Sequence, residues 1–374
     1  MKIPLSRPDI TKKEIEAVVS VLETPNLSLG PKLPEFEKKF ARYIGTEYAV
    51  AVNSGTSGLH LCIKALDIKD GDEVITTPFS FIASANCILF ERAKPVFVDI
   101  REDTLNIDEE EIEKRITKKT KAILPVHVFG YPCDMLKVSR IARKYNLAVI
   151  EDSCEAIGAE ISGRKVGTFG DCAVFAFYPN KQMTTGEGGM IVTDNSRIAD
   201  LAKSLRNQGR DGGMKWLAHR RLGYNYRLSD INCALGIAQM ERLKELLKKR
   251  EKIAGLHHKY LSPIEEIILP PQGDARIKRS WFVYVIRLNE SFSERQRNEL
   301  IEKLRAKGSD CNVYFPAIHL QPFYKSQFKY KKGDYPVTEM VCGRTIALPF
   351  YNDLSEKKIK FIAKSLKELI REVK

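Results

Sequence analysis

The stretch CAVFAFYPNKQMTTGEGGMIVTD, residues 172–194, joins two apolar runs through a turn that holds one lysine, two threonines and several glycines. Short runs that are almost entirely apolar are typical of strands buried on both faces of a sheet. The two runs therefore predict two buried strands, with Lys181 just beyond the end of the first. A loop lysine is usually a solvated charge, but an amine held at the end of a buried strand can act as a nucleophile or a proton carrier.

Similar runs recur through the first two thirds of the chain. They predict strands at residues 47–52, 72–77, 94–100, 121–128 and 147–152. Helical patterns between them predict helices over residues 56–66, 80–93 and 135–146. This alternation predicts an α/β fold with a large, doubly wound, mostly parallel sheet that is covered by helices on both faces.

A second, smaller α/β unit is predicted at the C-terminal end. Residues 229–250 have the pattern of one long amphipathic helix that leads into it. The unit itself is predicted to hold strands at 280–288 and 311–315, a helix over 293–308 and a closing helix from about Ser355. A chain of 374 residues is long enough for one large and one smaller domain. We place the boundary near residue 245, which gives domains of residues 1–245 and 246–374.

The composition indicates a globular protein of the cytoplasm. Hydrophobic residues make up 43% of the chain and charged residues 29%. No apolar run approaches the length of about 18 residues that a membrane-spanning helix needs, and the start MKIPLSRPDI lacks the apolar core of a secretory signal. The eight cysteines are scattered singly and never form CxxC, which favours reduced thiols over disulfides or a metal site.

The formal net charge of +13 raises the question of nucleic acid as a partner. The lysines and arginines are interleaved with acidic residues, as in KELLKKREK, which is typical of solvated helix faces. We therefore expect no nucleic-acid partner, and a general attraction for anionic substrates remains.

Two further motifs lie at predicted strand ends. In NSGTSG a strand leads into a helix at Gly55, and free amides there with the hydroxyls of Thr56 and Ser57 form a phosphate site or an ordinary helix cap. In EDSCEA the carboxylate of Asp152 ends a strand, where it either faces a ligand or caps a turn. A phosphate cradle, a strand-end carboxylate and a strand-end lysine together match the phosphate, the pyridine nitrogen and the aldehyde of pyridoxal phosphate.

The motifs also resemble those of a known family. The sequence is similar to sugar aminotransferases of the DegT/DnrJ/EryC1/StrS family, which have the aspartate-aminotransferase type of pyridoxal-phosphate fold. The resemblance runs from LSRPDI to LPFYNDLSE. It is carried most strongly by GPKLPEFEKKFA, NSGTSGLHL, GDEVITTPFSFIASANCI, EDSCEAIGA, YPNKQMTTGEGGM, LRNQGR and GYNYRLSDINCALG.

The resemblance implies roles for the residues that match the family pattern. Lys181 would hold the cofactor aldehyde as a Schiff base and carry the proton, and Asp152 would face the pyridine nitrogen. The phosphate would bind the turn of Gly55, Thr56 and Ser57. Phe81 would stack on the cofactor ring, and Asn225 would reach the cofactor phosphate of the neighbouring subunit, which implies a homodimer with shared active sites.

Two positions depart from the family pattern. Many members have FSF where this chain has FAF, so Ala176 lacks a hydroxyl that would contact the phosphate. Many members carry histidine or glutamine where this chain has Glu155, and a carboxylate there is typical of members that resemble perosamine synthases. A carboxylate near the phenolic oxygen of the cofactor would repel it unless the two share a proton.

The resemblance further implies transamination from glutamate to a keto sugar linked to a nucleoside diphosphate, with a perosamine-type amino sugar for surface polysaccharide as the first choice. A cyclitol or antibiotic-sugar acceptor is the alternative. The diphosphate calls for cations and the base for a stacking partner, and the closing C-terminal segment adds two residues. The substrate-binding candidates, each of which is otherwise a surface or packing residue, are Arg210, Lys215, Trp216, Arg220, Arg227, Tyr314 and His319.

Three other classes are disfavoured. A non-catalytic regulator with this fold would not be expected to keep Lys181, Asp152 and the phosphate turn. Related sugar dehydratases have histidine in place of the lysine. A nicotinamide-dependent oxidoreductase would need a GxGxxG motif after a strand, and none is present.

Overall fold

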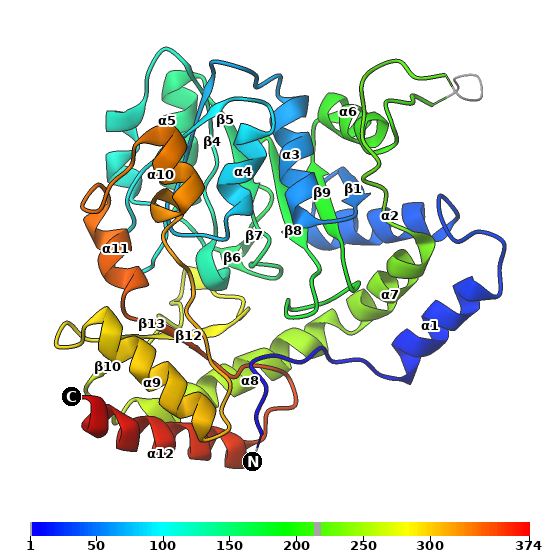
Figure 1. Cartoon of the computed structure of the whole chain (residues 1–374). Helices are drawn as coiled ribbons and strands as arrows, with labels where there is room; N and C mark the ends of the chain where they lie inside the picture. Colours follow the sequence, from blue (N-terminus) through cyan, green and yellow to red (C-terminus); the bar gives the residue numbers. More distant parts are fainter. Residues whose placement is uncertain (1, 213–217) are drawn as a thin grey trace.

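The computed structural model describes residues 2–212 and 218–374, and its centre is a seven-stranded sheet with the order β1-β9-β8-β5-β4-β2-β3 (Figure 1). The four pairs from β8 to β3 are parallel, and β9 runs antiparallel to both β1 and β8. The predicted α/β fold with a mostly parallel sheet is confirmed. All seven predicted strands belong to this sheet, as β1 (Tyr48–Val52), β2 (Glu73–Thr76), β3 (Lys94–Phe97), β4 (Thr120–Ile123), β5 (Ala148–Asp152), β8 (Cys172–Ala176) and β9 (Gly189–Thr193).

Helices cover both faces of the sheet, because alternate side chains of each strand point to opposite sides. In β8, Val174 packs in the cluster that holds α3, α4 and α6, whereas the ring of Phe175 lies 5.2 Å from that of Phe40 in α2. One face thus carries α3 (Gly55–Ala65), α4 (Ala83–Leu89) and α6 (Ser196–Arg206). The other carries α2 (Lys32–Ile44), α5 (Met135–Tyr145) and α7 (Asp230–Glu241).

The C-terminal part of the chain has a second core around a three-stranded antiparallel sheet of β10 (Ile267–Ile268), β12 (Tyr284–Leu288) and β13 (Thr345–Leu348). The helices α8 (Leu243–Leu261), α9 (Glu294–Ala306) and α12 (Glu356–Val373) contribute to this core. The N-terminal residue Ile3 is fully buried in the same core, and its N–H donates to the carbonyl of Gly308 at 2.8 Å. The domain boundary near residue 245 stays a prediction.

Short elements connect the two parts. The helices α10 (Pro322–Phe328) and α11 (Pro336–Cys342) return from the C-terminal part to the large sheet. There the hydroxyl of Tyr324 donates to Asn86 Oδ1 at 2.8 Å, and the N–H of Thr338 donates to Asp99 Oδ1 at 2.9 Å. A small sheet lies apart from the others and is formed by β6 (Glu160–Ile161), β7 (Arg164–Lys165) and β11 (Ile277–Lys278).

Two predicted elements are wrong. The predicted helix over 229–250 is two helices, since α7 ends and α8 begins around Arg242, whose N–H bonds the carbonyl of Gln239 rather than that of residue 238. The predicted strand at 311–315 is irregular and pairs with β13 through a single bridge between Asn312 and Ala347. The strand that completes this sheet is β13, which the sequence analysis did not identify.

No helix within the described ranges combines the length and the apolar character needed to cross a lipid bilayer. All eight cysteines are free thiols.

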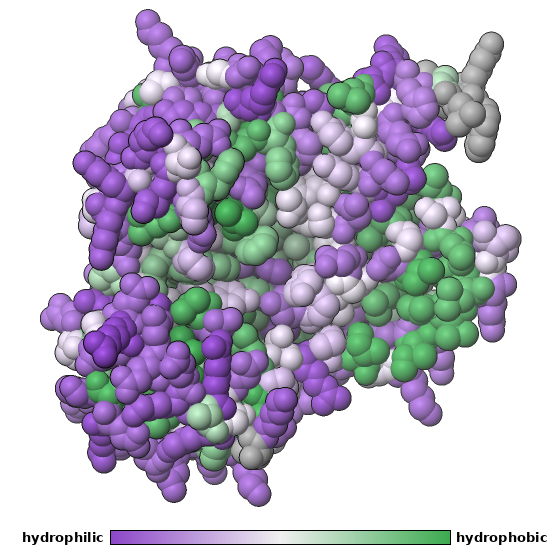
Figure 2. All heavy atoms as spheres, viewed as in Figure 1, coloured by the Kyte–Doolittle hydropathy of each residue, from purple (hydrophilic) through white to green (hydrophobic). Residues whose placement is uncertain are grey.

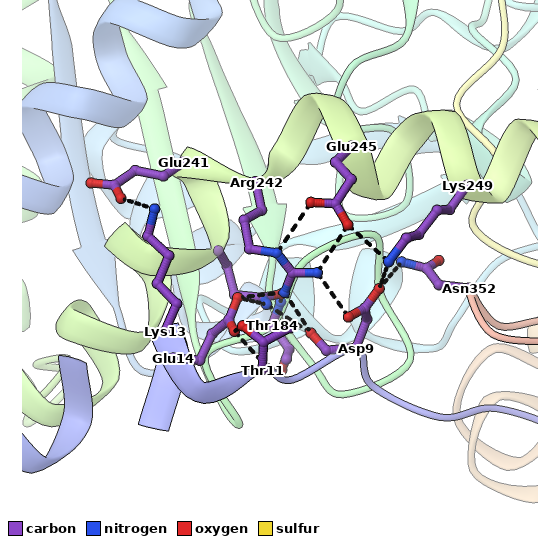
Figure 3. A network of polar contacts seen from close by, with 11 residues as sticks. Asp9, Thr11, Lys13, Glu14, Thr184, Glu241, Arg242, Glu245, Lys249 and Asn352 are labelled. Carbon is purple, nitrogen blue, oxygen red and sulfur yellow. Dashed lines mark hydrogen bonds and ion pairs between the residues drawn. The ribbon is translucent and has the colours of Figure 1, made fainter. Parts of the chain in front are cut away.

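A buried polar network fixes the N-terminal segment against the junction of α7 and α8 (Figure 3). Arg242 lies 2.7 Å from Glu14 of α1 (Lys12–Leu22) and 3.0 Å from Asp9. Lys249 also reaches Asp9, at 2.9 Å. Because Glu14 is fully buried, its charge depends on these donors and on the Nε2 of Gln239 at 2.8 Å.

The network lowers the pKa values of both acids. Burial by itself would raise the pKa of Asp9, but hydrogen bonds from Lys249, Arg242 and Asn352 outweigh it and bring the pKa from 3.8 to about 2. Burial opposes hydrogen bonds in the same way at Glu14, where donors on Thr11, Arg242 and Gln239 bring the pKa from 4.5 to about 2. Since the folded pKa values lie below the unfolded ones, this stabilisation is present above about pH 4.5 and is lost as the pH falls towards 2.

We therefore expect Arg242→Met to lower the free energy of unfolding at pH 7 by about 3 kcal/mol, because it leaves Glu14 buried without its cation. The acid dependence of stability between pH 5 and pH 2 should also become less steep. Denaturant unfolding at a series of pH values measures both effects.

Lys13→Met is the matched control. Lys13 and Glu241 form an ion pair whose side chains are 51% and 41% exposed, so its loss should change the stability by less than about 0.5 kcal/mol. Equal effects of the two substitutions would contradict the assigned role of the buried network.

Candidate active site

A cavity of about 480 Å³ lies at the carboxyl edge of the large sheet. The strands β5 and β8 end there, and the antiparallel strand β9 begins there, so the loops that follow or precede them converge. Its volume suits a small cofactor together with part of a substrate. The residues that line it include Ser54, Gly55, Thr56, Ser80, Phe81, Ser84, Asp152, Cys154, Glu155, Ala176, Tyr178, Asn180, Lys181, Phe282 and Tyr314.

One end of the cavity is formed by the N-terminus of α3. Ser54 caps this helix by accepting the N–H of Ser57 at 3.1 Å, and Gly55 and Thr56 line the cavity. A Cβ on Gly55 would come within 2.9 Å of both Ala176 Cβ and Cys154 Sγ, so the close approach of the backbone requires glycine. The amides of a helix N-terminus can bind a phosphate here.

Ser57 does not line the cavity. Its hydroxyl donates to Asn53 Oδ1 at 2.7 Å, and this bond stabilises the turn between β1 and α3. Among the three predicted phosphate residues, Gly55 and Thr56 lie at the cavity and Ser57 supports it.

Asp152 lies at the end of β5 and is 4% exposed. Its Oδ2 accepts the hydroxyl of Ser84 at 2.7 Å, and its Oδ1 accepts the N–H of Cys154 at 3.2 Å. Ser84 in turn lies 2.8 Å from the hydroxyl of Ser80. The carboxylate thus has the donors that its burial requires, and both serines line the same cavity.

Lys181 and Glu155 face each other across the cavity. The Nζ of Lys181 lies 3.6 Å from Glu155 Oε1 and 3.9 Å from the centre of the Phe282 ring. The other oxygen of Glu155 accepts the N–H of Phe129 at 2.8 Å. Burial raises the pKa of Glu155, and the nearby amine of Lys181 limits the rise. A carboxyl group in this state can share a proton with a neighbouring base.

The outer wall is aromatic. Phe81 is 60% exposed and lines the cavity, as predicted for a ring that stacks on a flat ligand. The hydroxyl of Tyr314 accepts a hydrogen bond from Asn180 Nδ2 at 3.3 Å, and burial raises the pKa of Tyr314 to about 12. The tyrosine therefore stays neutral over the physiological pH range.

The other predicted site residues that the structure describes do not line this cavity in the single chain. His319 is fully buried, and its Nε2 lies 3.0 Å from Glu339 Oε1, so its placement speaks against contact with a substrate. Asn225 accepts Asn53 Nδ2 through its carbonyl at 3.4 Å. The predicted contact of its side chain with a partner subunit stays a prediction.

The predicted cations lie farther from the cavity. Arg210 borders a separate hollow, Arg220 lies 3.4 Å from Asp211, and Arg227 donates to Asn207 Oδ1 at 3.0 Å. Lys215 and Trp216 lie outside the described residues. Contact between any of these residues and a substrate stays a prediction.

The sequence analysis missed several residues of the site. Ser80 and Ser84 are spaced four apart in FSFIAS, the spacing of neighbours on one face of a helix, and this spacing was the available signal. Phe282 and Asn180 have no comparable signal, because Phe282 comes from a distant part of the chain and Asn180 has the character of an ordinary turn residue.

The cavity fits pyridoxal phosphate. Helix amides at one end suit its phosphate, a buried carboxylate suits its protonated ring nitrogen, and an amine beside an acid suits its aldehyde. Among the described residues, no group of three or more His, Cys, Asp or Glu is placed to hold a metal ion. The fold and the cavity together define the class of protein, a pyridoxal-phosphate-dependent aminotransferase.

The comparison with known proteins gives the family. The chain belongs to the DegT/DnrJ/EryC1/StrS aminotransferase family, whose model matches residues 8–367. The predicted membership and enzyme class are therefore confirmed.

Individual relatives are similar over nearly their whole length. The chain is 37% identical to GDP-perosamine synthase of Caulobacter vibrioides, over 99% of this chain and 98% of that protein. It is also 37% identical to the spore coat polysaccharide biosynthesis protein SpsC of Bacillus subtilis, over 99% and 97%. The structure of the putative sugar aminotransferase Spr1654 from Streptococcus pneumoniae, PMP-form, matches with a TM-score of 0.95 at 28% identity, over 100% of both chains.

The missing hydroxyl at Ala176 can be tested directly. Ala176 lies beside Gly55 at the amide end of α3, so Ala176→Ser should add a donor to the bound phosphate and tighten pyridoxal phosphate binding about threefold to tenfold. Titration of the apoenzyme with the cofactor, followed by visible absorbance, measures this affinity.

Ala83→Ser serves as the control, because it adds a hydroxyl to the same cavity at the start of α4. We expect it to leave the affinity within about twofold. An unchanged or weaker affinity of the Ala176→Ser variant would show that the phosphate does not lie at the α3 end.

Proposed function

We propose that this protein transfers an amino group from glutamate to a keto sugar linked to a nucleoside diphosphate. The observation that carries the proposal is the convergence of Lys181, Asp152 and the α3 N-terminus on one cavity. When bound, pyridoxal phosphate supplies an electron sink for the carbon that gains or loses the amino group. The product that we favour is a perosamine-type amino sugar for surface polysaccharide.

The side chains have distinct roles in this proposal. Lys181 would hold the cofactor through its aldehyde, and its amine would carry the proton that leaves or joins the donor α-carbon. Glu155, 3.6 Å from that amine, is placed to take up or return the proton. Asp152 would face the ring nitrogen and favour its protonated form, because Ser84 and the N–H of Cys154 hold its Oδ atoms in place.

The reaction has two halves that use one site. Glutamate would give up its amino group, which the cofactor would carry, and leave as 2-oxoglutarate. The keto sugar would then accept the amino group by the reverse sequence of proton transfers, and the oxygen atoms exchanged in the two halves would balance as water taken up and released. Phe81 and Tyr314 stand at the wall of the cavity, where a sugar would enter. The similarity to GDP-perosamine synthase supports the choice of acceptor. A cyclitol or an antibiotic sugar is the alternative acceptor.

We also propose that the protein is a cytoplasmic homodimer with shared active sites. Helix α1 turns Ile15, Val19 and Leu22 outward, and the three are 56%, 45% and 55% exposed. Figure 2 shows an apolar area where α1 lies in Figure 1. A stripe of this kind is costly in water and is typical of a contact with another protein. The partner that we assign is a second copy of this chain, because only in a dimer could Asn225 make its predicted contact with the active site of the neighbouring subunit.

Replacement of the lysine tests the chemistry. Borohydride should fix pyridoxal phosphate to Lys181 in the native enzyme, and a peptide map should find the modified residue. In Lys181→Ala the label should be absent and turnover should fall by at least about 10³-fold, because the variant lacks both the anchor and the proton carrier. Normal turnover of this variant would refute the proposed role.

A panel of keto sugars linked to GDP, UDP or dTDP, offered with ¹⁵N-labelled glutamate, identifies the acceptor. We expect the label to appear in a GDP-linked amino sugar. If the label passes from glutamate to the cofactor but to none of these sugars, the acceptor is a different compound, such as a cyclitol. No transfer of label at all would favour a non-catalytic role.

A charge in the apolar stripe tests the dimer. Leu22→Glu should convert the dimer into monomers in size-exclusion chromatography with light scattering, because the carboxylate would lose its hydration in the contact. Activity should fall together with the dimer fraction. The control Leu136→Glu places the same charge on α5, where Leu136 is 54% exposed, and should stay dimeric. A native protein that is monomeric at micromolar concentration would contradict the proposal.

A further inference from the structure

Arg250 is a buried cation in the middle of α8, directly behind the Lys181 turn. The side chain is 3% exposed, and its guanidinium donates to three backbone carbonyls. One nitrogen, Nη1, bonds the carbonyl of Phe282 at 2.9 Å. The other, Nη2, bonds the carbonyls of Lys181 at 2.7 Å and Asn180 at 3.2 Å.

Within the described part of the chain, no carboxylate oxygen lies within 4.0 Å of the Arg250 guanidinium. Asp9 stabilises the charge only from beyond this distance, and its carboxylate is bonded to Arg242 and Lys249. Burial lowers the pKa of Arg250 to about 10, so the group is still charged at neutral pH. The guanidinium carbon also lies 5.5 Å from the centre of the Phe350 ring. Burial of a cation on carbonyls and an aromatic face, without a carboxylate, is still costly, and a packing role would be met by an apolar side chain.

The bonded carbonyls belong to residues whose side chains meet in the active site. Lys181 Nζ lies 3.9 Å from the centre of the Phe282 ring. Arg250 therefore ties together the backbones of two residues that are about 100 positions apart in the chain and that contact each other in the cavity. A planar guanidinium can reach carbonyls on both segments at once, which the single ammonium group of lysine cannot do with the same geometry.

We propose that Arg250 is a positioning residue for the transamination, which holds the Lys181 turn and Phe282 in register so that the lysine amine meets the reacting carbon. The inference rests on the proposed function of Lys181. Because Arg250 does not touch the cavity itself, its effect is on the placement of the amine and not on substrate binding. Misplacement of a reacting group by about 1 Å is enough to slow a reaction about 10²-fold.

Arg297 provides a matched comparison. It is also a buried arginine on a helix, with 2% exposure, and its Nη1 donates to the carbonyls of Cys342 and Thr345 at 2.8 and 2.9 Å. It lies in α9 and does not line the active-site cavity. Substitution of either arginine should cost stability, but only substitution of Arg250 should alter the chemistry.

The experiment compares Arg250→Met, Arg250→Lys and Arg297→Met as purified holoenzymes, below their unfolding temperatures. The readouts are thermal unfolding, kcat and KM for glutamate in the first half-reaction, and the fraction of Lys181 that borohydride fixes to pyridoxal phosphate. We expect Arg250→Met to lower kcat about 10²-fold and to reduce the fixed fraction, with KM for glutamate changed less than about threefold. Arg250→Lys should recover about tenfold in kcat, and Arg297→Met should keep kcat within about twofold.

Arg250→Met with native kcat and native labelling would overturn the inference, and so would a loss of activity in Arg297→Met of equal size. If Arg250→Met does not fold, a double-mutant cycle of Arg250→Lys and Phe282→Leu decides. Losses in kcat that differ in the double variant from the sum of the two single losses support a shared role, and additive losses refute it. Failure of the proposed function has a different signature, because the protein with native Arg250 would then show no first half-reaction with glutamate and no borohydride labelling of Lys181.

Discussion

The charge of Asp152 at the end of a strand that is buried on both faces is the constraint on which the site depends. A carboxylate in that place is stable only with donors, and these come from Ser84 on α4 and from the backbone of Cys154. The helix α4 must therefore lie against the end of β5. This placement also sets Phe81, just before α4, at the wall of the cavity. One electrostatic requirement thus positions both the carboxylate that is predicted to face the ring nitrogen and the ring that is predicted to stack on the cofactor.

The large sheet could be predicted from the sequence because its strands are continuous apolar runs, which few other structures explain. The errors fall where packing between distant segments decides the structure. The break at Arg242 interrupts an amphipathic pattern that continues across it. At the break Arg242 pairs with Asp9 and Glu14, more than 200 residues away in the chain, and such contacts cannot be read from the local pattern. Residues 311–315 have the composition of a strand, but Tyr314 and Phe315 turn to the aromatic wall around Phe129 instead of a sheet.

The same holds for the site: residues placed by local sequence could be predicted, and residues placed by contacts between distant segments could not. Asp152 ends β5, and Gly55 and Lys181 follow the ends of β1 and β8 by three and five residues. Local sequence is therefore enough to place all three at one edge of the sheet. Of the predicted cations, Arg210, Arg220 and Arg227 do not line the cavity of the single chain, and neither does Asn225. In the proposed dimer, contacts made by a second subunit could not be read from one chain. Arg250 was missed for another reason: it stands in KKREK, which has the composition of a solvated helix face. Only the packed structure shows that this arginine is buried whereas its neighbours in the sequence are not.

The burial of Ile3 in the C-terminal core has a consequence for synthesis of the protein. Ile3 bridges to Ser309, so its partner does not exist until roughly 300 further residues have been made. At about 5 to 20 residues per second this takes roughly 15 to 60 s, during which the N-terminal segment has no place to dock. The large sheet can form in that interval, but the N-terminal segment can dock only after residue 309 has been made. A peptide tag fused ahead of Ile3 would thus disturb this late docking and spare the formation of the large sheet.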